Sequence, residues 1–166
     1  MARLKTVLWI AGLILVFDQI SKYIIVQVMD LKTVRVIEVW DPFITFIMAW
    51  NRGINFGLFA GQGDVMRWVL IAVALVITGW VLWWMRQPHH GPWVLASAGL
   101  IVGGAIGNVI DRVVYGAVAD FLNVTCCGIR NPWSFNVADI AIFVGAFGLI
   151  LLAGDGKGRD VGKNPR

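Results

Sequence analysis

Asp139 and Asn136 stand near the start of the last apolar segment of this chain, FNVADIAIFVGAFGLILLAG. A carboxylate at the mouth of an apolar helix is costly, so it needs a partner or a function. Two facing carboxyl groups that share one proton can hydrolyse a peptide bond, because the ionised group activates water while the protonated group donates to the carbonyl oxygen. The simpler alternative is that Asp139 and Asn136 stabilise the first turn of a helix. Residue chemistry alone leaves both readings open.

Further polar residues share helical faces within or beside the other apolar segments. Asp18 and Lys22 are four residues apart, which allows an ion pair on one face of a helix. Asn108 stands three residues before Asp111 and four before Arg112, again on one face. Ionisable residues inside membrane segments are functional candidates. Each set also has a structural alternative: a buried Asp18–Lys22 ion pair, and an Asp111–Arg112 charge pair at a helix end.

The elements that must position these residues are membrane helices. Hydrophobic residues make up 58% of the 166 residues, charged residues make up 14%, and the mean hydropathy is +0.75. Soluble domains contain about 25% charged residues, so this composition indicates a membrane protein. Nine tryptophans agree, because indole favours the headgroup region. Four apolar segments are long enough to span a bilayer as helices, and helices satisfy the backbone in lipid; they are residues 6–29, 65–85, 93–110 and 135–154.

These segments predict a single domain, residues 1–166, with a membrane all-α fold of four transmembrane helices. Residues 6–29 resemble the start of a signal peptide, but no small-residue cleavage site follows, so we expect a retained helix. Four spans place both termini on one side, and the basic N-terminus and tail favour the cytoplasm. The link 86–92 is then cytoplasmic, and the tail 155–166 is expected to be disordered.

Two outer segments connect the predicted helices. Residues 30–64 contain two runs rich in β-branched and aromatic residues, 33–40 and 42–50, separated by an Asp-Pro turn signal. They predict a small β-hairpin or cradle on the outer membrane surface. Residues 111–134 form a short outer loop between the third and fourth helices. The polar candidates all fall near the outer ends of their helices, so we expect them to meet at one membrane level.

Other catalytic chemistries have less residue support. A metalloprotease needs a set of His, Asp or Glu ligands, yet His89 and His90 are adjacent on the inner link. A serine enzyme needs Lys or His within reach of its serine, and neither Ser21 nor Ser134 makes a convincing pair. We therefore expect no metal ion and no cofactor.

Two non-enzymatic classes also stay open. In a small ion-coupled transporter or channel component, intramembrane charges would line a pathway. The acids gather at one level, however, and no inverted repeat is visible. A non-catalytic assembly subunit is the other class.

Cys126 and Cys127 are neighbours in the outer loop, where a disulfide is possible, and no base for a nucleophilic role stands nearby.

Five polar blocks occur in an order typical of one family. They are DQISK (18–22), NRGINFGLF (51–59), GGAIGNVIDR (103–112), GAVADF (116–121) and FNVAD (135–139). With these blocks, the chain resembles lipoprotein signal peptidase, also called signal peptidase II, of bacterial inner membranes over nearly its whole length. Two departures are visible: Ile54 and Asn55 replace the usual small residues after the glycine of the second block, and VADF stands where the family often has VVDF.

The resemblance implies an aspartic endopeptidase that cuts diacylglyceryl-cysteine-modified prolipoproteins just before the lipidated cysteine. It implies that Asp120 and Asp139 are the catalytic pair, at the outer (periplasmic) face. A place near a helix N-terminus favours an anion, so Asp139 is the expected general base and Asp120 the acid. The implied partners are prolipoproteins, membrane lipids and globomycin-type inhibitors, without nucleic acid. The other matching positions would bind substrate or support the site, and they are Asn51, Gly53, Asn108, Asp111, Arg112 and Asn136, with Asp18 and Lys22 as a structural motif.

Overall fold

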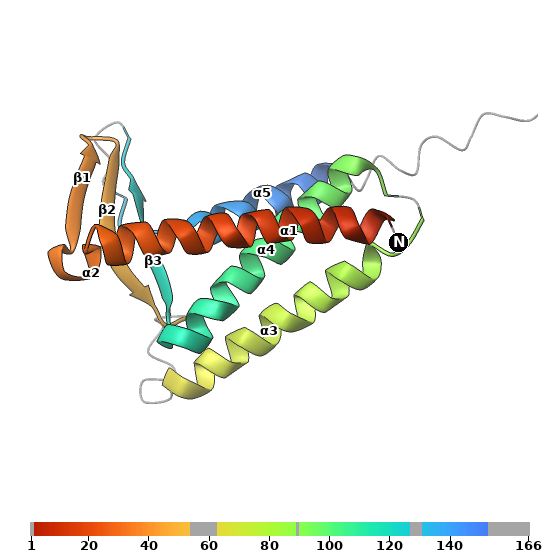
Figure 1. Ribbon diagram of the computed structural model, residues 1–166, viewed down its shortest axis with the longest axis horizontal. Coiled ribbons are helices and arrows are strands. Elements are labelled where there is room, and N and C mark those ends of the chain that lie inside the picture. The colour runs from red at the N-terminus through yellow and green to blue at the C-terminus, as the bar shows by residue number, and fades with distance from the viewer. Residues whose placement is uncertain (1, 54–62, 89, 127–130, 153–166) are drawn as a thin grey trace, which may run out of the picture.

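A helical bundle with a small sheet at one end makes up the fold (Figure 1). The computed structural model describes residues 2–53, 63–88, 90–126 and 131–152. Helix α1 (Ala2–Lys22) continues as a π-helix, η1 (Tyr23–Val28), which leads into the single turn α2 (Leu31–Val34). The other helices are α3 (Gly63–Trp84), α4 (Pro92–Tyr115) and α5 (Val137–Leu152).

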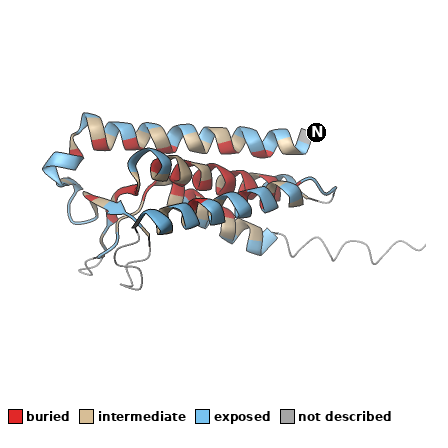
Figure 2. Ribbon diagram, turned by 90° about the horizontal axis from the view of Figure 1, so that it is seen from below, coloured by how far each residue is buried: buried red, intermediate tan, exposed pale blue. Residues whose placement is uncertain are grey.

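Helix α4 is the centre of the bundle, since α1, α3 and α5 all pack against it. Buried residues gather where the helices face one another, whereas the outward faces are exposed (Figure 2). Glycines let the helices approach closely. A Cβ atom on Gly103 would lie 2.6 Å from the carbonyl oxygen of Ala11 in α1, and one on Gly145 would lie 2.6 Å from the carbonyl oxygen of Ser97 in α4.

Within the described residues, three helices are long and apolar enough to cross a membrane, and they correspond to the first three predicted spans. Helix α5 is apolar but shorter, with 16 residues, and the chain after Leu152 lies outside the described residues. The outward side chains of α5 are apolar, and Phe143 and Ile150 are each about three-quarters exposed. The three long spans are Arg3–Val28, Asp64–Trp84 and Pro92–Tyr115.

The predicted hairpin is present, and it belongs to an antiparallel sheet of three strands in the order β1-β2-β3. Strands β1 (Val36–Trp40) and β2 (Ile44–Asn51) flank the Asp-Pro turn. Strand β3 (Val118–Val124) comes from the segment that we expected to be only a loop, and it pairs Asp120 with Ala49 of β2. The sheet therefore joins two segments that are far apart in the sequence.

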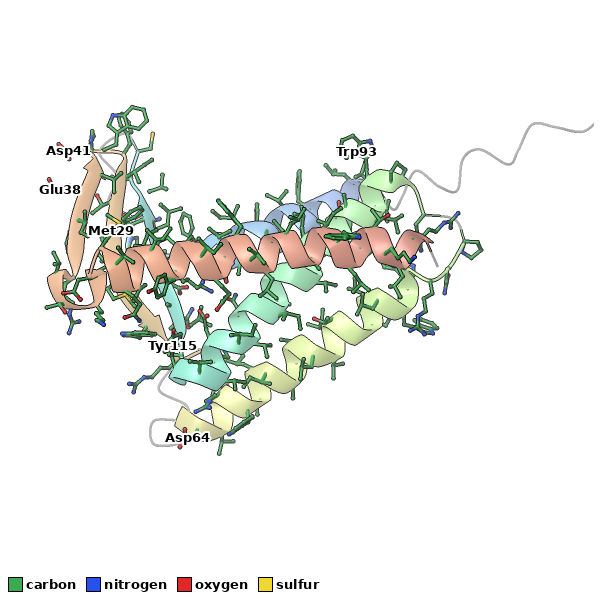
Figure 3. All side chains as sticks on the ribbon, in the orientation of Figure 1. Met29, Glu38, Asp41, Asp64, Trp93 and Tyr115 are labelled. Atoms are coloured by element: carbon green, nitrogen blue, oxygen red, sulfur yellow. The ribbon has the colours of Figure 1, made fainter. Side chains whose placement is uncertain are left out.

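One face of the sheet rests on η1 and α2. Val26, Leu31, Met48, Ala119 and Phe121 form a small buried cluster there. Because successive strand residues point to opposite faces, this packing turns Asp120 to the other face, toward the helical bundle. Figure 3 shows Met29, Glu38 and Asp41 at the sheet end of the molecule and Trp93 at the opposite end.

Several predictions fall on residues outside those described. These are the disordered tail 155–166, the departures at Ile54 and Asn55, and the histidine at position 89. Cys126 is disulfide-bonded, and Cys127 lies outside the described residues.

Candidate active site

Asn136 brings the two predicted catalytic acids together. Asp120 lies in the middle of β3, and Asp139 lies in the first turn of α5. The Asn136 side-chain Nδ2 donates to Asp120 Oδ1 at 2.7 Å, and the Asn136 backbone N–H donates to Asp139 Oδ2 at 3.3 Å. In return the Asp139 N–H donates to Asn136 Oδ1 at 2.9 Å. The exchange between Asn136 and Asp139 is a capping box, so the helix-capping alternative is confirmed. Together with the bond to Asp120, it places both carboxyl groups beside Asn136.

The carboxyl group of Asp120 is almost fully buried, with 3% of the residue exposed. Burial, followed by the nearby negative charge of Asp139, raises the pKa of Asp120 to about 7. Hydrogen bonds from Asn136 and from Asn51 Nδ2, at 3.1 Å to Oδ2, oppose this rise because they stabilise the anion. Asp120 is thus a carboxylic acid that can carry a proton near neutral pH.

Asp139 is partly buried and receives hydrogen bonds that suit an anion. Asn108 Nδ2 on α4 donates to Asp139 Oδ1 at 2.8 Å, in addition to the bond from Asn136. The first turn of a helix also favours negative charge. Asn108 Oδ1 in turn accepts from Asn136 Nδ2 at 3.3 Å. Two asparagines therefore connect the acids to α4.

A cavity of about 640 Å³ opens beside Asp120. Asn51 and Arg112 line it together with apolar groups such as Leu70 of α3. Arg112 Nη1 donates to the Asn108 carbonyl oxygen at 3.2 Å, while its buried Nε has no partner among the described residues. The cavity is large enough for a short peptide segment and offers a guanidinium as a hydrogen-bond donor. Its other lining residues are Ala49, Trp50, Gly53, Pro132, Trp133 and Ser134.

Asn51 is held in place by the backbone that follows β2. The Gly53 N–H donates to Asn51 Oδ1 at 3.0 Å, which turns the Asn51 Nδ2 toward Asp120. Gly53 has a φ of +112°, and a Cβ there would lie 2.8 Å from a side-chain carbon of Leu70. The position therefore suits glycine on both conformational and steric grounds.

Asp18, Lys22 and Asp111 form a buried ion cluster behind the acids. The expected Asp18–Lys22 pair is confirmed, at 2.7 Å between Nζ and Oδ2. Lys22 Nζ lies equally close, at 2.7 Å, to Asp111 Oδ2 of α4. The alternative of an Asp111–Arg112 ion pair is wrong. Asp111 pairs with Lys22 of α1, whereas Arg112 donates to the carbonyl oxygen of Asn108. The spacing of Asp111 and Arg112 could not reveal a partner on another helix.

The family model described as signal peptidase (SPase) II matches residues 10–153. The chain belongs to the signal peptidase II family. A curated relative from Methylorubrum extorquens (strain PA1), named lipoprotein signal peptidase, is 50% identical over 114 residues, covering 66% of this chain and 63% of the relative. One from Alteromonas mediterranea with the same name is 39% identical over 146 residues, covering 87% of this chain and 78% of the relative.

The fold agrees with solved structures of similar sequence. One described as a bacterial membrane enzyme, solved by the in meso method at 2.3 Å resolution, has a TM-score of 0.77 and 26% identity. The superposition covers 97% of this chain and 95% of the solved chain. As a member of the signal peptidase II family, the chain is an aspartic peptidase and a membrane protein. Nothing in these similarities supports the transporter or channel alternative.

Sequence reasoning missed one residue of the candidate site. Gln19 Nε2 donates to Asp18 Oδ2 and to Asp111 Oδ1, each at 3.1 Å. Gln19 stands directly after Asp18, and adjacent helix residues do not share a face. The DQISK block contains Gln19, but only the three-dimensional structure shows that it reaches a second helix. Within the described residues there is no group of three His, Cys, Asp or Glu residues that could hold a metal ion.

Proposed function

We propose that this chain is an aspartic endopeptidase that removes the signal peptides of prolipoproteins, with Asp120 and Asp139 as its catalytic pair. The relatives named lipoprotein signal peptidase support the substrate class. The observation that carries the residue assignment is that Asn136 contacts both carboxyl groups, one through its side chain and one through its backbone.

In the proposed mechanism, Asp139 is the general base and Asp120 is the general acid. Asp139 takes a proton from water as the water oxygen attacks the scissile carbonyl carbon, while Asp120 donates its proton to the carbonyl oxygen. The resulting gem-diol then collapses as its C–N bond breaks. Asp139 returns its proton to the leaving amine, and Asp120 takes back a proton from a gem-diol hydroxyl as the carboxyl group forms. The pKa of about 7 for Asp120 supports its part as the acid, because this carboxyl group can carry a proton near neutral pH.

The remaining site residues position the acids and the substrate. Asn51, Asn108 and Asn136 hold the carboxylates, and Gly53 supports Asn51. Arg112 lines the cavity, so we assign its guanidinium group to a carbonyl group of the substrate backbone.

The substrate reaches this site at the membrane surface. A diacylglyceryl anchor keeps the modified cysteine at one bilayer depth, so the bond just before that cysteine meets only acids at the same depth. We assign α5 as the fourth span, which places the termini in the cytoplasm and the sheet at the outer, periplasmic face of a bacterial inner membrane. Membrane lipids surround the exposed apolar helix faces.

Residues 1–166 then form a single peptidase domain. The outer segment 30–64 supplies β1, β2 and Asn51, and the link 86–92 is the inner connection between α3 and α4. Globomycin-type inhibitors would occupy the cavity beside Asp120 in place of the substrate.

The test uses purified protein in lipid bilayers with a precursor that carries diacylglyceryl-cysteine. We expect cleavage just before the modified cysteine, unchanged by a chelator, and loss of cleavage by at least about 10³-fold in Asp120→Asn and in Asp139→Asn. Matched changes at acids outside the site, such as Asp64→Asn in α3, should leave the rate unchanged. An intact precursor with the unaltered protein would reject the proposal.

A further inference from the structure

Asp18 of α1 is tied to the residue that precedes Asp139. Its Oδ1 accepts a hydrogen bond from the Ala138 backbone N–H at 2.9 Å, and both Asp18 and Ala138 are fully buried. A backbone hydrogen bond to a buried carboxylate is charge-assisted and fixes the position of the peptide group. The first turn of α5, which carries Asp139, is thereby attached to α1.

Asp111 of α4 is tied in the same way to the residue that precedes Asp120. Its Oδ2 accepts a hydrogen bond from the Ala119 backbone N–H at 3.2 Å, and both residues are buried. Strand β3 starts just after α4, close to Tyr115 in Figure 3, so this bond links the start of the strand to the last turns of the helix. The backbone that carries Asp120 is thereby attached to α4.

Two donors on α1 join these two buried carboxylates. Lys22 Nζ contacts Asp18 Oδ2 and Asp111 Oδ2, each at 2.7 Å. Gln19 Nε2 contacts Asp18 Oδ2 and Asp111 Oδ1, each at 3.1 Å. The four side chains form one unit, which we call the carboxylate bridge.

We propose that the carboxylate bridge, and Gln19 within it, sets the separation of the catalytic pair Asp120 and Asp139 by fixing the peptide group before each acid. Gln19 is then a positioning residue for the reaction, acting without contact to the substrate. This inference rests on the catalytic assignment made above, and it explains why an uncharged side chain stands between two buried acids.

Gln19 offers a sharper test than Lys22. Removing Lys22 would leave two buried carboxylates without their cation, and the protein would be expected to unfold more readily. Gln19 is only partly buried and lines a small cavity of about 150 Å³, so leucine fits with little steric change. Gln27 lines the same cavity, but its side-chain contact is with the exposed Lys32. Gln27→Leu is therefore the matched control.

The kinetic experiment uses lipidated precursor in bilayers and compares four proteins: the unaltered protein, Gln19→Leu, Gln19→Asn and Gln27→Leu. Gln19→Leu is expected to lower kcat by about tenfold with KM within about twofold, because misplaced catalytic groups slow the chemical step while the substrate cavity is unchanged. Gln19→Asn, which keeps an amide but is one methylene shorter, is expected to show the same loss. Gln27→Leu should match the unaltered protein. An unchanged kcat in both Gln19 variants, or an equal loss in Gln27→Leu, would overturn the proposal.

A second readout does not depend on cleavage. The carboxyl carbon of Asp120 can be followed by NMR in protein labelled with carbon-13 aspartate, and it is assigned by its absence from Asp120→Asn. Among the described residues, the charged groups near Asp120 are Asp139 on α5, Lys22 on α1, and Asp111 and Arg112 on α4. If Gln19→Leu lets the two acids move apart, their repulsion falls and the titration midpoint of Asp120 moves to lower pH by about half a unit or more.

The two readouts separate the two proposals. If the unaltered protein does not cleave the precursor, the catalytic assignment fails, while the titration still measures whether Gln19 controls the spacing of the acids. A titration midpoint that is the same in the unaltered protein, Gln19→Leu and Gln27→Leu would reject the carboxylate bridge as a positioning device, whatever the cleavage result.

Discussion

At the residue scale, Asn136 serves two purposes that looked like alternatives. Its side-chain oxygen caps α5 through the Asp139 N–H, while its side-chain nitrogen holds Asp120. An amide can do both because it carries an acceptor and two donors. Capping and support of the site are therefore properties of the same side chain, and a substitution must be chosen to separate them.

Asn136→Ser separates them. Serine remains a good helix N-cap but is too short to reach Asp120, so the unfolding temperature should stay close to that of the unaltered protein while kcat/KM falls by about 10²-fold. Asn136→Ala loses both contacts and should also lose about 1 kcal/mol of stability. Cleavage rates and thermal unfolding in detergent measure the two effects. Full activity in Asn136→Ser would show that the contact with Asp120 has no part in catalysis.

The raised pKa of Asp120 predicts how activity depends on pH. The proposed acid must be protonated, so kcat/KM should fall as pH rises above about 7. The pH profile of precursor cleavage measures this directly. An activity that stays constant to about pH 9 would contradict the part assigned to Asp120.

The same shift has a consequence for stability. The pKa of Asp120 is about 7 in the folded chain and about 3.9 in an unfolded one. The protonated form is favoured by folding, so its contribution is complete below about pH 4 and is lost as pH rises through about 7. The stability of Asp120→Asn should not fall in this way as pH rises. Thermal unfolding at acidic and alkaline pH would then show a flatter dependence of stability on pH in Asp120→Asn than in the unaltered protein.

Residue spacing predicted contacts within one helix and missed those between helices. The Asp18–Lys22 pair followed from a separation of four residues, and the structure contains it. The contacts of Asp111 with Lys22 and with Gln19 cross from α4 to α1. No local pattern encodes which faces of two helices will meet, so these contacts required the three-dimensional structure.

At the element scale, the close approach of α1 and α4 depends on small residues. A Cβ atom on Gly103 would lie 2.6 Å from the Ala11 carbonyl oxygen, which is backbone and cannot move aside alone. Gly107, one turn later, would meet Asp18 Oδ2 at 2.7 Å. The same interface therefore carries both the helix packing and the carboxylate bridge.

Gly103→Ala should force α1 and α4 apart and lower the free energy of unfolding by about 1–3 kcal/mol, as overpacking does in protein cores. Gly79→Ala in α3 is the control, because a Cβ there meets nothing within 4 Å. It should be neutral or stabilising by up to about 1 kcal/mol, since alanine is the better helix former. Unfolding in detergent measures both, and equal stability of the two variants would contradict the close contact.

The sheet shows what sequence patterns can and cannot specify for an element. The hairpin followed from two runs of β-branched and aromatic residues around an Asp-Pro turn, and β1 and β2 lie there. Strand β3 was missed because its partner β2 lies far away in the sequence.

The end of the third span was also predicted too early. The prediction stopped at Ile110, whereas α4 continues to Tyr115. Asp111 and Arg112 fit within the helix because Asp111 pairs with Lys22 and Arg112 donates to the Asn108 carbonyl oxygen.

At the scale of the whole molecule, the candidate site lies at the sheet end of the bundle (Figure 1). Asp120 is in the sheet and Asp139 is in the first turn of α5, so both acids are at the same end of the helices. A substrate held by a lipid anchor at that depth is delivered to the acids, whereas a free peptide must find them from solution.

A precursor without the lipid should therefore be cut less efficiently, with kcat/KM lower by about 10²-fold or more, since anchoring raises the local concentration at the site. The comparison requires the same peptide sequence with and without the diacylglyceryl group, assayed in the same bilayers. Asp139→Asn provides the background rate for both forms. Equal kcat/KM values for the two forms would show that membrane depth plays no part in selecting the substrate.

The central place of α4 also bears on how the chain is assembled during synthesis. Helices α1 and α3 pack chiefly on α4 and have little contact with each other. The first half of the protein thus enters the lipid bilayer without its main helical neighbour, and only the later arrival of α4 gives Lys22 its second acidic partner. Insertion of α4 therefore gives α1 and α3 a common helix to pack on, and α5 then packs on the same helix.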